Sequence, residues 1–127
     1  MDALDQRIRA FVLFEAATFI AAALVHSGVL VRGYEHQQAR TAESVIALVL
    51  LAGLALSWIR PARTREVGLI VQGLALLGTL VGVFTIVVGV GPRTVPDVVY
   101  HVGIVTVLIG GIVTAIQPPR PHDRASS

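Results

Sequence analysis

Residues 67–90 read VGLIVQGLALLGTLVGVFTIVVGV, a run of 24 residues without a charged side chain. About 20 apolar residues in helical form are needed to cross a hydrocarbon core that is roughly 30 Å thick. Backbone N–H and C=O groups in lipid must be satisfied within their own segment, which a single span achieves only as a helix. The run therefore predicts a transmembrane α-helix over residues 67–90.

Three further apolar runs of similar length precede or follow this one, over residues 10–31, 42–59 and 95–116. The connections between the runs are short, and they are polar or contain helix breakers, as in residues 91–94, GPRT. Short connections place consecutive helices side by side and antiparallel. The sequence thus predicts an all-α fold, an integral membrane four-helix bundle with up-down-up-down topology, built from one domain over residues 1–116.

The composition agrees with a membrane protein and excludes several kinds of chemistry. Hydrophobic residues make up 54% of the chain and charged residues only 14%, whereas soluble domains are about one quarter charged. The chain has no cysteine, and all ten of its basic residues are arginine. Disulfides, thiolate metal sites and lysine chemistry are therefore excluded. The net charge of +2 and the scatter of arginines over helix ends predict the lipid bilayer, and no nucleic acid, as a partner.

The arginines are unevenly distributed along the chain. Seven of the ten lie in the first nine residues, in the connection 60–66 or after residue 116, and three lie in the other two connections. Positively charged residues beside membrane spans mark the cytoplasmic side. We therefore expect both termini in the cytoplasm, with residues 117–127 as a disordered cytoplasmic tail. Arginine without lysine, beside abundant alanine, valine, leucine and glycine, favours a bacterial chain in the cytoplasmic (inner) membrane.

Two histidines stand inside apolar runs, His26 in the first and His101 in the fourth. A helical rise of 1.5 Å per residue places both in the outward half of the bilayer, where ionisable side chains are costly and usually functional. Histidines on facing helices of a bundle are typical ligands of haem b, so both are predicted to bind a cofactor. For a divalent ion, zinc or iron, Glu43 and His36 would complete the set of metal ligands. The predicted function is cofactor or metal binding, with a role in electron transfer or redox chemistry.

A second polar pair is predicted in the inward half of the bilayer. Glu15 is the sixth residue of the first run and Gln72 the sixth residue of the third, so the two side chains are expected to share a layer and to form a hydrogen bond. Glu15 lies eleven residues before His26, which places both on one face of their helix. That face must point into the bundle, because lipid contact would expose a carboxylate. Glu15, with Gln72, is thus a buried proton-binding candidate, and a proton-coupled small-molecule transporter is one alternative function.

Other residues allow structural interpretations. Asp97 stands three residues after Thr94 and fits a capping box at a helix start, and Tyr100 fits an aromatic residue of the membrane interface. Gly78 and Gly82 have the GxxxG spacing that permits close helix packing within a bundle, in a homodimer or in a larger membrane complex. A non-catalytic subunit or scaffold of such a complex is the second alternative function. No set of nucleophile, base and orienting group can be read from the spacing, so an enzyme is the least expected class.

Overall fold

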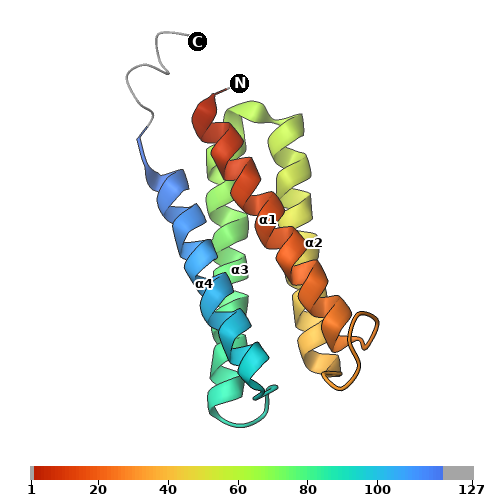
Figure 1. Cartoon of the computed structure of the whole chain (residues 1–127). Coiled ribbons are helices and arrows are strands. Elements are labelled where there is room, and N and C mark those ends of the chain that lie inside the picture. The colour runs from red at the N-terminus through yellow and green to blue at the C-terminus, as the bar shows by residue number, and fades with distance from the viewer. Residues whose placement is uncertain (1, 119–127) are drawn as a thin grey trace.

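The computed structural model describes residues 2–118, which fold into four long α-helices (Figure 1). They are α1 (Ala3–His26), α2 (Gln37–Ile59), α3 (Thr64–Val87) and α4 (Val95–Ile116), with one turn of 3-10 helix, η1 (Pro61–Arg63), before α3. No strand occurs in this part of the chain, so the predicted all-α four-helix fold is confirmed. Each helix is long and apolar enough to cross a membrane. Most of the predicted tail, residues 119–127, lies outside the described residues.

Consecutive helices run in opposite directions, as an up-down-up-down bundle requires (Figure 1). One end of the bundle, which we call the proximal end, holds the start of α1, the end of α4 and the connection 60–63. The opposite end, which we call the distal end, holds the segments 27–36 and 88–94. Helix α1 contacts all three other helices, so side chains on its inner face are enclosed by α2, α3 and α4.

Helices α1 and α3 both end earlier than hydropathy predicts. Gly28 has a φ of 77°, a left-handed conformation that glycine adopts without a steric penalty. Its N–H bonds to the carbonyl of Val25, and the next N–H bonds to the carbonyl of Leu24, which is the Schellman pattern that terminates a helix. Gly89, with a φ of 86°, ends α3 in the same way. The predictions that these helices reach residues 31 and 90 are therefore wrong, because hydropathy does not register the glycine at which the backbone turns.

The starts of three helices also differ from the apolar runs. Helices α1, α2 and α3 begin at residues 3, 37 and 64, before the predicted starts at 10, 42 and 67. The side chains of Asp2 and His36 each accept a backbone N–H at the start of α1 and α2. Such caps fix the starts of α1 and α2 and extend these helices beyond their apolar parts, whereas the start of α3 has no side-chain cap. Helix α4 has the predicted bounds, 95–116.

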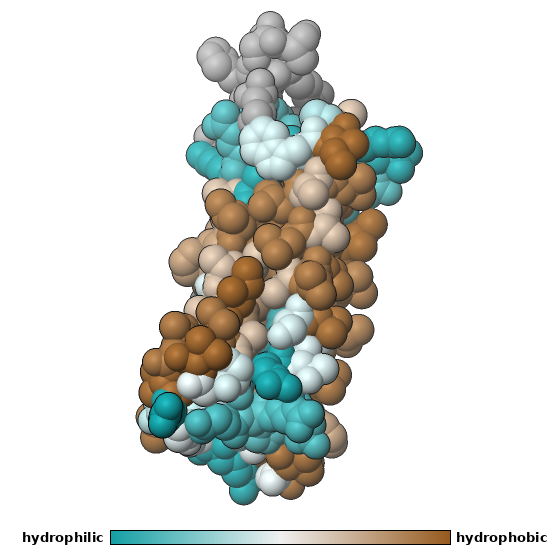
Figure 2. Space-filling model, turned by 90° about the vertical axis from the view of Figure 1, so that its right-hand side faces the viewer, coloured by the Kyte–Doolittle hydropathy of each residue, from teal (hydrophilic) through white to brown (hydrophobic). Residues whose placement is uncertain are grey.

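Apolar side chains fill the core and also cover the outside of the bundle. The core includes Ile8, Phe19, Leu50, Ala75 and Leu108, none of which is more than 2% exposed. Figure 2 shows hydrophobic side chains over the middle of the molecule and hydrophilic side chains gathered towards its two ends. Soluble monomers rarely expose apolar patches of this extent, so the outer surface suits contact with lipid.

The Gly78 and Gly82 pair faces the interior of the bundle. A Cβ atom on Gly78 would lie 3.0 Å from the side chain of Ile46 on α2, and one on Gly82 would lie 3.3 Å from Nε2 of His101 on α4. The missing side chains therefore let α3 approach α2 and α4, as small residues do in membrane bundles. A homodimer or a larger complex through this stripe stays a prediction.

Candidate functional site

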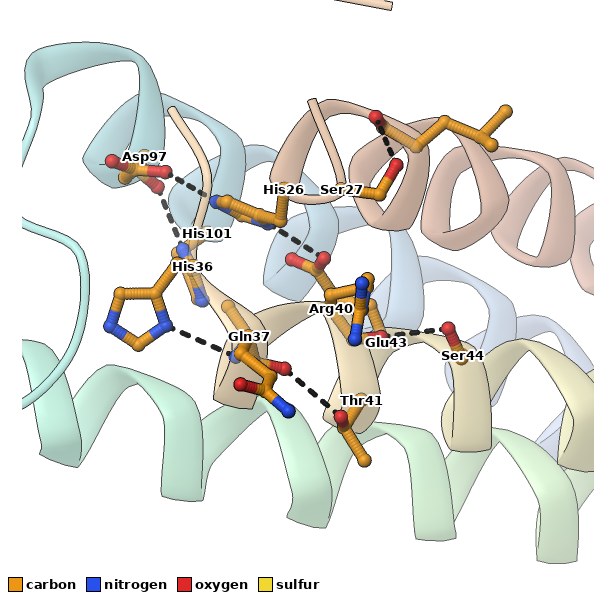
Figure 3. Close-up of polar contacts among 12 residues, drawn as sticks. His26, Ser27, His36, Gln37, Arg40, Thr41, Glu43, Ser44, Asp97 and His101 are labelled. Atoms are coloured by element: carbon orange, nitrogen blue, oxygen red, sulfur yellow. Dashed lines mark hydrogen bonds and ion pairs between the residues drawn. The ribbon is translucent and has the colours of Figure 1, made fainter. Parts of the chain in front are cut away.

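Five polar side chains gather at the distal end of the bundle (Figure 3). His26 is the last residue of α1, His36 and Glu43 stand at or near the start of α2, and Asp97 and His101 lie in the first two turns of α4. The antiparallel topology brings the end of α1 beside the starts of α2 and α4, so residues far apart in sequence meet here. The partial positive charge at the start of α4 favours the carboxylate of Asp97.

His26 lies between two carboxyl groups and joins three helices. Its Nδ1 is 2.7 Å from Oε2 of Glu43 on α2, and its Nε2 is 3.0 Å from Oδ1 of Asp97 on α4. All three side chains are buried, with at most 7% of each exposed. We call these three residues the carboxylate–histidine cluster.

The two contacts of His26 define the charge of this cluster. Each contact is a hydrogen bond only if a proton lies between the nitrogen and the oxygen, so two protons are shared among the three groups. Either the imidazole is cationic between two carboxylates, or it is neutral and one carboxyl group is protonated. Both assignments give a net charge of about −1, because two carboxyl groups and one imidazole then hold two protons between them. The cluster is therefore a site of buried negative charge.

Asp97 combines two roles. One of its carboxylate oxygens, Oδ2, accepts hydrogen bonds from the N–H of Thr94, at 3.2 Å, and from the hydroxyl of Thr94. The hydroxyl of Thr94 in turn accepts the N–H of Asp97 at 3.3 Å, which completes the predicted capping box. The other oxygen, Oδ1, contacts His26. The cap thus holds Asp97 in the orientation that its contact with His26 needs.

Replacing Thr94 with alanine removes the hydroxyl that caps α4. We expect the free energy of unfolding to fall by about 1 kcal/mol, the usual cost of losing an N-cap side chain. Thermal unfolding in a mild detergent measures this loss. Thr106→Ala is the matched control, because the hydroxyl of Thr106 bonds to the carbonyl of Val102 within the same helix. Equal losses in the two variants would contradict a special role for the cap.

His101 and Tyr100 form one wall beside the cluster. Nδ1 of His101 is 2.7 Å from the backbone carbonyl of Asp97, to which it donates, so its Nε2 keeps a free lone pair in the neutral ring. The ring of Tyr100 packs edge-on against His101 and against Phe19, with centroid separations of 5.1 and 6.3 Å. The hydroxyl of Tyr100 is buried and has no hydrogen-bond partner among the described residues.

A cavity of about 290 Å³ lies between α2, α3 and α4 beside this wall. Most of its lining is apolar, and it also includes His36, Glu43, Tyr100 and His101. We call it the distal cavity. A second hollow, of about 390 Å³, lies between α1 and α4 and is lined by His26, Asp97 and again Tyr100. Tyr100 therefore stands between two spaces, each of which also touches the carboxylate–histidine cluster.

The predicted cofactor ligands are brought together only in part. His26 and His101 both bond to Asp97, and Glu43 bonds to His26. His36 caps α2, accepting the N–H of Ala39 at 3.2 Å, and its ring centroid lies 6.5 Å from that of His26. Within residues 2–118 no group of three or more His, Cys, Asp or Glu side chains has the arrangement of a metal site. Haem b and a divalent ion stay predictions for these residues.

Glu15 and Gln72 lie in one layer, as predicted, but no hydrogen bond joins them through the amide nitrogen of Gln72. Both side chains are completely buried, and a Cβ atom on Gly111 of α4 would contact the Oε1 atoms of both. The amide nitrogen of Gln72 donates instead to the carbonyl of Gly68 in its own helix, at 2.9 Å. Both oxygens of Glu15 and Oε1 of Gln72 have no partner among the described residues.

A polar cluster at the proximal end was not predicted from the sequence. Arg9 is only 5% exposed. Its guanidinium group donates to the hydroxyl and carbonyl of Ser57, at 3.2 and 2.7 Å, and to the hydroxyl of Thr64 at 3.1 Å. It also lies over the ring of Trp58, 4.2 Å from the ring centroid. In the sequence, Arg9 served only as evidence for the orientation of the chain in the membrane. An arginine beside the start of an apolar run nevertheless has the reach to hold neighbouring helices together.

Comparisons of the chain with protein-family models, with curated proteins and with solved structures found no match. The function of the distal site is therefore inferred from its own geometry and chemistry.

Proposed function

We propose that the protein is a multi-pass membrane protein that binds a small molecule in the distal cavity. Four apolar helices and an apolar outer surface support its insertion in a bilayer. The arginines of the start of α1 and of residues 60–66 lie at the proximal end, which supports a cytoplasmic location for that end and for both termini. The distal cavity then opens in the half of the bilayer away from the cytoplasm.

The observation that carries the proposal is the convergence of polar groups on a cavity with a mostly apolar lining. Glu43, Tyr100 and His101 all line it. Apolar pockets with a few convergent polar groups are typical of small-molecule sites. The hydroxyl of Tyr100 is buried without a partner among the described residues, and leaving such a group unsatisfied costs about 1–3 kcal/mol. A ligand whose polar group reaches this hydroxyl would recover this cost.

The polar groups favour a ligand that donates hydrogen bonds and carries a positive charge. Nε2 of His101 and the carboxyl group of Glu43 accept hydrogen bonds, and the hydroxyl of Tyr100 accepts or donates one. The negative charge of the cluster favours a cation beside it. We therefore infer a ligand with an apolar body and an amine group. Haem b is the alternative, because the lone pair of His101 suits iron. His26 would have to leave a carboxyl group to become the second ligand.

Binding of benzylamine to the protein in lipid nanodiscs tests this proposal, with benzyl alcohol as the neutral probe. We expect the wild type to bind the amine more tightly than the alcohol. His101→Ala and Tyr100→Phe should each weaken amine binding about tenfold, which corresponds to 1.4 kcal/mol, the size of one hydrogen bond. Thr106→Val, which leaves the cavity intact, should bind as the wild type does. A wild-type protein that binds neither benzylamine nor benzyl alcohol would overturn the proposal.

The same preparation distinguishes the cofactor alternatives. Protein purified with haem b would show a Soret band that is lost in His26→Ala and His101→Ala. This result would identify haem, instead of an amine, as the ligand. Stoichiometric zinc or iron in a colourless sample would favour an ion held by His26, His101, Glu43 and His36. Either result would contradict the amine ligand while retaining the distal site.

A further inference from the structure

Glu15 is a buried acidic residue that the distal site does not use. It lies on α1, eleven residues before His26, so about 16 Å of helix separates the two positions. Its side chain is 0% exposed and is enclosed by Gln72 of α3 and Gly111 of α4. The layer of Glu15 is therefore spatially separate from the carboxylate–histidine cluster.

The hydrogen bonds around Glu15 leave a deficit of donors. Both oxygens of Glu15 and Oε1 of Gln72 are buried without a partner among the described residues. The amide nitrogen of Gln72 already donates to Gly68. An ionised carboxylate only accepts hydrogen bonds, and so does the oxygen of an amide. Three acceptors without a donor would each incur a desolvation cost of about 1–3 kcal/mol.

The charges around Glu15 leave a second deficit. Along α2 no charged residue occurs between Glu43 and Arg60, and along α3 none occurs between Glu66 and Arg93. Along α4 no ionisable residue follows His101 before the helix ends. On α1 the flanking ionisable residues are Arg9, whose guanidinium bonds to Ser57 and Thr64, and His26, which bonds to Glu43 and Asp97. A charged carboxylate without a counter-ion is very costly in such surroundings.

We propose that Glu15 and Gln72 form a proton-binding site, in which one proton on Glu15 is donated to Oε1 of Gln72. A single proton removes the charge of Glu15 and supplies a donor for Oε1 of Gln72, so that only the carbonyl oxygen of Glu15 is left without a donor among the described residues. The absence of a side chain at Gly111 gives the two oxygens the space to approach each other. This site is independent of the ligand in the distal cavity.

Infrared spectroscopy of the full-length protein in lipid nanodiscs tests the site at neutral pH. We expect a carboxylic-acid C=O band that shifts to lower frequency after transfer to D₂O, which shows that the proton exchanges. The band should be lost in Glu15→Gln, which keeps a donor of the same size towards Gln72, and retained in Glu66→Gln, which alters an exposed residue. A spectrum in which Glu15→Gln removes no such band would overturn the proposal, and so would a band that never exchanges.

Two variants test the hydrogen bond to Gln72. Gln72→Met removes the acceptor at similar volume, so the band should move to higher frequency. Gly111→Ala should have the same effect, because its Cβ would collide with Oε1 of Gln72. Gly110→Ala is the control, because its Cβ would make only an ordinary contact with Phe11, at 3.6 Å. An unchanged band in Gln72→Met would refute the shared proton. Benzylamine binding is measured separately, so its loss does not decide this result.

Discussion

Replacing His26 with alanine is expected to lower the free energy of unfolding by about 3–5 kcal/mol, the cost of removing one partner from a buried ionic network. The variant leaves the carboxyl groups of Glu43 and Asp97 buried without the imidazole between them. It also removes the polar contacts that tie α1 to α2 and to α4 at the distal end. Reversible unfolding in mixed detergent micelles, followed by far-UV circular dichroism, measures the loss.

His36→Ala is the matched control for this experiment. The ring of His36 is close to that of His26, but it caps α2 instead of bridging carboxyl groups. Loss of such a cap costs about 1 kcal/mol. His26→Gln, which keeps one hydrogen-bond donor, should fall between the two alanine variants. A loss in His26→Ala that is no larger than the loss in His36→Ala would show that the cluster does not hold the helices together.

The meeting of His26, Glu43 and His101 at one end of the bundle follows from the sequence, because antiparallel helices place residues of equal depth in the membrane side by side. The contact of His26 with Asp97 does not follow from the sequence. The capping box of Asp97 accounts for its Oδ2 atom and is visible in residues 94–97. Its Oδ1 atom contacts a residue 71 positions away on another helix. A local pattern identifies the first role and carries no information about the second.

The depth of His26 was predicted from an apolar run that ends at Val31, whereas α1 ends at His26 itself. Gly28 ends the helix because its left-handed conformation allows the Schellman bonds. At the end of α1, the histidine ring contacts Glu43 of α2 and Asp97 of α4. The glycine was visible in the sequence, but a hydropathy average does not weight it.

The layer that holds Glu15 and Gln72 was predictable, because both stand at equal distances from the predicted starts of their apolar runs. The amide nitrogen of Gln72 does not donate to Glu15, because it has a competing acceptor four residues earlier, the carbonyl of Gly68. Side-chain to backbone bonds of this kind depend on the rotamer and on the neighbouring helices. Sequence spacing fixes the layer and leaves the choice of partner open.

Replacing Gly53 with alanine is expected to lower the free energy of unfolding by about 1–3 kcal/mol, the usual cost of overpacking a core. A Cβ atom on Gly53 of α2 would lie 2.5 Å from Cγ1 and 2.7 Å from Cγ2 of Val71 on α3. Valine is branched at Cβ and restricted at χ1, so a rotation does not clear both methyl groups. The two helices must therefore separate. Gly73→Ala is the control, because its Cβ would have no atom within 4 Å, and it should gain up to about 1 kcal/mol of helix propensity.

The same substitution should also weaken binding of benzylamine in the distal cavity. Helices α2 and α3 both line the cavity, through residues that include Glu43 and Gly78, and a helix transmits a displacement along its length as a stiff element. Val71→Ala in the same chain removes the methyl groups that collide with the new Cβ, so the double variant should recover both stability and affinity. Gly73→Ala should leave the affinity unchanged. Gly53→Ala protein that is destabilised but binds as tightly as the wild type would show that the α2–α3 spacing in the core does not set the shape of the cavity. Equal stability of Gly53→Ala and Gly73→Ala would contradict the close contact itself.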